Sequence, residues 1–175
     1  MPSGKTHTKI NLLSLPIVLL ILILYGLTTL DFLLTFAIGF LVGTFFLTPD
    51  LDIHSSAYKK WGILRIFWYP YQVVMPHRSP LTHTIIIGDL IRILYMLIVF
   101  SPFLYVLNVT ILEGRLLELA KEHEMALITF VMGVIVASTL HIVADHISTR
   151  KRKRSAEEER DKVKLHSEGV ITSEY

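Results

Sequence analysis

The chain has 175 residues and is 52% hydrophobic, with a formal net charge of +2 at neutral pH. This length suits one domain, but the composition is too apolar for an ordinary soluble domain. The chain contains no cysteine, which excludes disulfides, iron–sulfur clusters and thiolate zinc sites. Any bound metal must therefore be held by imidazole and carboxylate groups, which suit zinc, manganese or iron better than copper(I).

Four apolar runs dominate the sequence, and each approaches the roughly 20 residues that cross a hydrocarbon core. They show no polar face with a helical period, which argues against a soluble helical protein with an apolar core. The sequence therefore predicts an all-α integral membrane bundle of four transmembrane helices. The runs are residues 12–26, 30–47, 85–107 and 125–144.

The connection between the second and third runs, from about His54 to Arg78, is rich in aromatic and basic residues. Aromatic side chains with polar tips beside basic side chains are typical of the headgroup region. We expect an interfacial helix or re-entrant segment here, and a packed aromatic lid over the bundle is a compatible alternative.

The predicted domain covers residues 1–149, and a charged tail covers residues 150–175. A solvated helix extension that frays into disorder is the expected form of the tail. Its basic cluster would attract anionic lipid, so membrane lipids are the expected partners and no nucleic-acid partner is expected.

Counting membrane crossings places the candidate ligands on one side of the membrane. A chain that crosses four times returns to the side of its amino terminus after the second and fourth crossings, and so both termini share a side. Most Lys and Arg residues outside the runs fall on that side, which the positive-inside rule identifies as cytoplasmic. We expect a protein of the inner or cytoplasmic membrane with its site on the cytoplasmic face.

His141 and Asp145 are four residues apart near the end of the fourth run. This spacing places both side chains on one helix face, and ionisable residues within an apolar segment usually face a polar interior. A hydrogen bond between the two side chains explains the pair equally well.

Asp50 and Asp52 follow Pro49 at the end of the second run. In an extended segment their carboxylates project to the same side and repel unless a cation or basic group lies between them. Solvated acids at a helix end are the alternative, although the carboxyl end of a helix disfavours negative charge.

His77 and His83 precede the third run, and Arg78 beside them is a candidate for binding an anionic substrate group. His7 stands in a short polar lead, residues 1–11, where a solvated histidine is the simpler interpretation. Within the third run, Arg92 follows Asp89 by three residues, and we expect a neutralising ion pair.

These residues exceed the ligands of one tetrahedral zinc. Either two metals share the carboxylates, or some residues orient ligands or carry protons. We therefore expect one or two divalent ions, with zinc first among the candidates.

Four stretches together resemble a family of uncharacterised membrane metal-binding proteins, the domain-of-unknown-function family DUF2227. That family is similar in motif order to YdjM-like inner-membrane proteins regarded as metal-dependent hydrolases, and more distantly to bacterial zinc-dependent phospholipase C. The resemblance implies that Asp52 and His77 act as ligands or as acid–base catalysts. It implies that the ligands are His7, Asp50, His83, His141 and Asp145. The stretches are MPSGKTH at residues 1–7, TPDLD at 48–52, the aromatic segment at 61–71 and HRSPLTH at 77–83.

Three functions follow as hypotheses. The first is a hydrolase that uses a metal-activated water on a lipid or amphiphile ester, above all a phosphoester. The second is a non-catalytic metal-binding protein, either a sensor or a structural anchor, with a closed ligand shell. The third is metal transport, which ranks last because transport needs polar groups at the membrane midplane.

Overall fold

The computed structural model describes residues 4–75 and 84–172, and every regular element in these ranges is a helix. Four helices are long and apolar enough to cross a membrane, namely α1, α2, α5 and α7. The all-α prediction is therefore confirmed for the described residues. The elements are α1 (Gly4–Leu24), α2 (Leu30–Phe45), the 3₁₀ turn η1 (Pro49–Asp52), α3 (Ser56–Lys60), the 3₁₀ helix η2 (Gly62–Trp68), α4 (Tyr69–Val74), α5 (Ile87–Thr110), α6 (Leu116–Glu122) and α7 (Glu124–Thr172).

Helix α1 begins eight residues before the apolar run that predicted it. The expected polar lead is therefore helical, and two of its polar side chains, His7 and Asn11, are buried rather than solvated. They are four residues apart, so they share one helix face. The polar residues at the start of α1 therefore extend the helix, and the face that carries His7 and Asn11 packs against the bundle.

Helices α2 and α7 pack closely along glycines. A Cβ atom on Gly39 would lie 2.1 Å from the Phe130 carbonyl oxygen, and one on Gly133 would lie 2.3 Å from the Phe36 carbonyl oxygen. Small residues let helix backbones approach in this way, which is typical of membrane bundles. This packing holds the middle of α2 against the amino-terminal part of α7.

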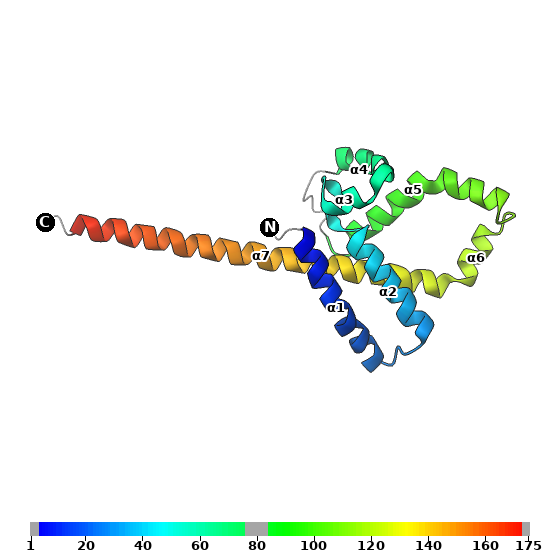
Figure 1. Cartoon of the computed structure of the whole chain (residues 1–175), viewed down its shortest axis with the longest axis horizontal. Coiled ribbons are helices and arrows are strands. Elements are labelled where there is room, and N and C mark those ends of the chain that lie inside the picture. The colour runs from blue at the N-terminus through cyan, green and yellow to red at the C-terminus, as the bar shows by residue number, and fades with distance from the viewer. Residues whose placement is uncertain (1–3, 76–83, 173–175) are drawn as a thin grey trace.

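The aromatic segment folds into α3, η2 and α4 beside the carboxyl end of α2 (Figure 1). Trp68 and Tyr71 are buried, and their rings contact Tyr95 of α5. Ile63 and Tyr69 are exposed on the outer face. The inner face forms the packed aromatic lid that was one interpretation of the sequence, and the interfacial placement of the outer face stays a prediction.

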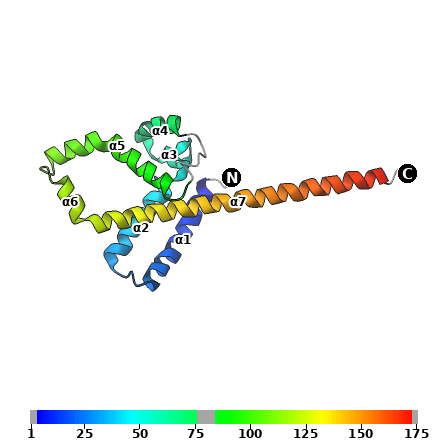
Figure 2. The ribbon, with the colours of Figure 1, turned by 180° about the vertical axis from the view of Figure 1, so that it is seen from behind.

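Helix α5 meets the bundle at its first turns, where its buried residues Gly88, Asp89 and Arg92 lie. Figures 1 and 2 show the rest of α5 running away from α7 to α6, which leads back to the start of α7. Helix α7 then continues past the bundle through the charged tail, ending at Thr172. The helix extension is confirmed, whereas the domain boundary near residue 150 coincides with no break in α7 and stays a prediction.

Candidate metal centre

Residues from three separate elements form a polar cluster at one end of the bundle. His7 comes from the first turns of α1, Asp50 from η1, and His141 and Asp145 from the middle of α7. His7 Nε2 lies 3.1 Å from Asp145 Oδ1. His141 Nε2 lies 3.4 Å from Asp50 Oδ2 and 3.7 Å from Asp145 Oδ2. The fold therefore unites four residues that are up to 138 positions apart in the sequence.

The two imidazole rings of the cluster stack with their centroids 4.0 Å apart and their planes at 27°. His7, His141 and Asp145 each offer one ligand atom, and these atoms all lie within 4.8 Å of one another. Two ligands at a tetrahedral angle around zinc, with bonds of about 2.0–2.1 Å, lie roughly 3.3 Å apart. The nitrogen–oxygen separations in the cluster match this spacing, so the donor set fits a divalent ion.

Two nitrogen atoms of the cluster are buried and have no hydrogen-bond partner among the residues that the structure describes, His7 Nδ1 and His141 Nε2. The contacts of His141 Nε2 with the carboxylates are thus close approaches without hydrogen-bond alignment. A buried nitrogen without a partner is costly. An ion held between the carboxylates and His141 Nε2 would satisfy that nitrogen, although not His7 Nδ1, because the nitrogen of His7 that faces Asp145 is Nε2. This supports the metal interpretation over the alternative of a simple His–Asp hydrogen bond within α7.

Asp50 and Asp52 do not lie in an extended segment, because η1 is a 3₁₀ turn. With about three residues per turn, side chains two positions apart point in different directions. Asp50 faces His141 and Asp52 is buried, and neither belongs to the group of three possible ligands formed by His7, His141 and Asp145. The roles of Asp52 as a ligand or as an acid–base catalyst stay predictions.

The remaining candidates, His77, Arg78 and His83, lie outside the described residues. Their expected roles as ligands, acid–base group or substrate-binding group stay predictions.

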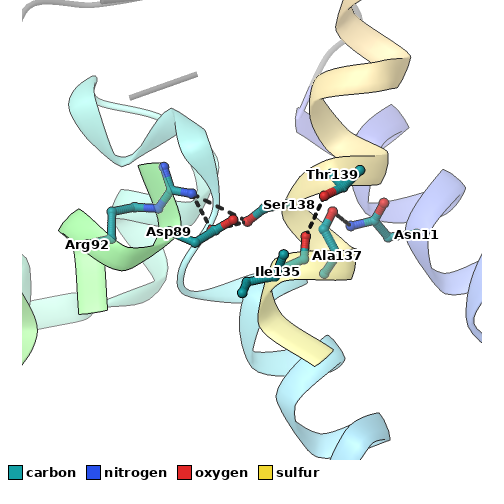
Figure 3. A network of polar contacts seen from close by, with 7 residues as sticks. All are labelled: Asn11, Asp89, Arg92, Ile135, Ala137, Ser138 and Thr139. Carbon is teal, nitrogen blue, oxygen red and sulfur yellow. Dashed lines mark hydrogen bonds and ion pairs between the residues drawn. The ribbon is translucent and has the colours of Figure 1, made fainter. Parts of the chain in front are cut away.

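Asn11 is a site residue that the sequence did not single out. Its Nδ2 donates to Thr44 Oγ1 and to the Ala137 carbonyl oxygen, each at 3.1 Å, and so joins α1 to α2 and α7 (Figure 3 shows the bond to Ala137). Thr44 Oγ1 donates in turn to the Phe40 carbonyl oxygen at 2.8 Å. These bonds fix the amide orientation, which leaves Oδ1 as a buried acceptor with no partner among the described residues. Its spacing of four from His7 is the signal that was available in the sequence.

A small polar cavity adjoins the cluster and shares His7, Asp50 and His141 with it. The volume open to the centre of a water-sized sphere is about 10 Å³, which is close to the minimum for one water molecule. Thr48 adds a second buried oxygen, Oγ1, without a hydrogen-bond partner among the described residues. The lining is completed by Asn11, Thr44, Thr8, Ser56, Ala57 and Lys60.

A second buried polar group lies on the other side of α7. Arg92 Nη2 contacts Asp89 Oδ1 at 2.5 Å, and Ser138 Oγ donates to the same oxygen at 2.6 Å (Figure 3). The predicted ion pair between Asp89 and Arg92 is confirmed. It ties the start of α5 to α7 and belongs to the architecture rather than to the candidate metal centre.

Comparison with known proteins agrees with the chemistry of this cluster. Residues 2–155 match the family described as "Uncharacterized metal-binding protein (DUF2227)". An "Uncharacterized protein" of Aquifex aeolicus (strain VF5) is 39% identical over 144 residues, covering 68% of this chain and 93% of that relative. No solved structure matches the chain. The chain therefore belongs to the DUF2227 family of uncharacterised metal-binding proteins.

Proposed function

We propose that the protein is a membrane-embedded, metal-dependent hydrolase that acts on a lipid or amphiphile ester, above all a phosphoester, at the cytoplasmic interface. The observation that carries the proposal is the polar cavity that shares both histidines with the candidate ligand cluster. A structural metal site is closed by protein ligands, whereas a catalytic site keeps a position for water or substrate. A cavity of about one water, lined by buried polar atoms without partners, supports the second arrangement.

The position of the cluster supports action at a membrane surface. His7 stands at the start of the α1 candidate span and Asp50 near the end of the α2 candidate span. Basic residues follow the cluster residues closely in the chain. Lys59 and Lys60 come after Asp50, at the end of α3, and the basic cluster at residues 150–154 comes after Asp145 in α7. By the positive-inside rule this end faces the cytoplasm, and an amphiphile would keep its acyl part in the bilayer while its headgroup reached the cavity.

The chain's own groups have distinct roles in such a reaction. A divalent ion, zinc first among the candidates, supplies the Lewis acidity that activates water and polarises an ester oxygen. His7 and His141 would hold it through imidazole nitrogen atoms, and the carboxylates of Asp145 and Asp50 would offset its charge. Asn11 Oδ1, as an acceptor, would orient a water by taking a hydrogen bond from it, and the Thr48 hydroxyl lies in the same lining.

The test begins with elemental analysis of the protein purified in detergent, followed by assays with phospholipids and chromogenic phosphoesters. We expect near-stoichiometric metal and hydrolysis that a chelator abolishes. The variant His7→Ala/His141→Ala should lose both. His146→Ala is the matched control, because His146 is exposed on the same helix, and it should keep both.

Two results would contradict the proposal in different ways. Metal that persists in the double variant would refute the site. A full complement of metal without hydrolysis of any phosphoester or carboxylic ester amphiphile would indicate a non-catalytic metal-binding protein. Metal uptake into proteoliposomes would instead revive a transport function.

A further inference from the structure

The cavity beside the cluster is too small for a whole substrate headgroup. Its volume of about 10 Å³ admits one water-sized group. A larger ligand must therefore bind at its rim and present one atom to the interior. The chemistry of the rim then decides which ligands are accepted.

Lys60, the last residue of α3, supplies the cationic side chain of the lining. Its Nζ lies 4.2 Å from the centroid of the Phe45 ring, an arrangement in which the ring face attracts the ammonium. Lys60 forms no ion pair with any residue in the part of the chain that the structure describes. Partial burial lowers the pKa of this ammonium, although the side chain as a whole is exposed.

The charges around the cavity favour an anion at this position. Asp50 and Asp145 carry the negative charges of the cluster, and a bound divalent ion would offset both of them. The Lys60 ammonium, ten residues along the chain from Asp50, then remains as an uncompensated cation. Lys60 lies on the same lining as the hydroxyl groups of Ser56 and Thr8, and hydroxyl groups donate hydrogen bonds to anionic oxygens.

Resting on the proposed function, we infer that Lys60 is a substrate-binding residue that holds an anionic phosphoryl group at the rim of the cavity, beside the metal cluster. A phosphoryl group has several acceptor oxygens, so it faces the ammonium and the hydroxyl groups while one oxygen remains directed toward the cluster. Lysine binds phosphate as a point charge, which suits a flexible side chain at a rim. The phosphoryl group belongs either to free phosphate or to a lipid headgroup.

The test uses the full-length protein in detergent, loaded with Mn²⁺, and measures the ³¹P relaxation of added inorganic phosphate. Bound Mn²⁺ accelerates the relaxation of phosphate that binds nearby, so the measurement reports both affinity and proximity. We expect Lys60→Met to weaken phosphate binding about tenfold with unchanged Mn²⁺ content. Lys59→Met is the matched control, because Lys59 is exposed on α3 and is not part of the cavity lining, and it should bind phosphate like the unaltered protein.

A second arm replaces phosphate with dodecyl phosphate. Tighter binding of dodecyl phosphate supports a lipid headgroup as the source, and equal binding supports free phosphate. If Lys60→Met fails to load Mn²⁺, Lys60→Arg provides the comparison, and it should retain binding because the charge is kept.

The failures are distinguishable. Absence of bound metal in the unaltered protein would refute the proposed function itself. Full Mn²⁺ loading without enhanced ³¹P relaxation, or equal phosphate affinity in Lys60→Met, would overturn the inference about Lys60 and leave the metal centre intact.

Discussion

Helix α7 carries two buried polar centres that begin less than one helical turn apart. At Ser138 it meets the ion pair of Asp89 and Arg92, whose side chains are each 1% exposed. At His141 and Asp145 it meets His7 and Asp50. The first centre contains its own permanent cation, because a guanidinium does not lose its proton in proteins. The second contains two carboxylates and two imidazoles, so its positive charge must come from protons or from a bound ion.

This difference separates a centre whose charges are paired within the protein from one that would gain a cation by binding an ion. Asp89 Oδ1 receives two contacts from the protein, from Arg92 and from Ser138. Each centre also keeps buried atoms without a hydrogen-bond partner among the described residues, namely Asp89 Oδ2 in the first and His7 Nδ1 and His141 Nε2 in the second. Neither burial nor an unpartnered atom therefore distinguishes the two centres, whereas the balance of charges does.

The largest expected effect comes from removing the cation of the first centre. Arg92→Met leaves the Asp89 carboxylate buried without its partner, which should destabilise the fold by about 3–5 kcal/mol. Denaturant unfolding in detergent measures the loss. The double variant Asp89→Asn/Arg92→Met should recover part of it, because the unpaired carboxylate of Asp89 is removed together with its cation. An unchanged midpoint for Arg92→Met would show that the pair contributes nothing.

Metal removal should affect the second centre alone. A ligand present at 100 times its dissociation constant stabilises a fold by about 2.7 kcal/mol, so chelation should lower the unfolding temperature of the unaltered protein. His141→Ala should abolish this response and weaken metal binding at least about 100-fold, beyond the usual loss for residues that only orient ligands. His146→Ala should respond to chelator like the unaltered protein. A chelator response that persists in His141→Ala would place the ion elsewhere.

The smallest expected effect concerns a single hydroxyl group. Ser138→Ala removes a hydrogen bond to a buried carboxylate and should cost about 1–3 kcal/mol. Thr139→Val is the matched control, since the neighbouring hydroxyl donates to the Ile135 carbonyl oxygen of its own helix at 2.8 Å (Figure 3). It should cost less than Ser138→Ala, and metal content should be the same in both variants. Equal losses would show that the link to Asp89 adds no stability.

Much of the fold was predictable because hydropathy is a local property. The four long apolar helices correspond to the four runs, and the turn near Gly26 falls where the first run was expected to end. The start of α1 was not predicted, because residues 4–11 are polar and hydropathy assigns polar residues to the outside. Their burial depends on α2 and α7, to which Asn11 is hydrogen-bonded.

The cluster of His7, Asp50, His141 and Asp145 was predictable in its composition and only partly in its geometry. His141 and Asp145 are brought together by helical spacing, as expected. Asp50 and Asp52 were expected to project to one side, which holds for an extended segment, but Pro49 begins a 3₁₀ turn and only Asp50 is seen against His141. Lys60 and Asn11 carried no motif, so their places beside the cavity became visible only in the folded chain.

The sequence by itself determined the number of long apolar helices and the kind of ligands available, because both follow from residue type along the chain. It also predicted that His7, Asp50, His141 and Asp145 would lie together, because a chain that crosses the membrane an even number of times returns to the side on which it began. Only the tertiary structure decided which face of each helix turns inward and which polar atoms surround the cavity. These depend on the close approach of α2 and α7 at Gly39 and Gly133, a contact between residues almost 100 positions apart.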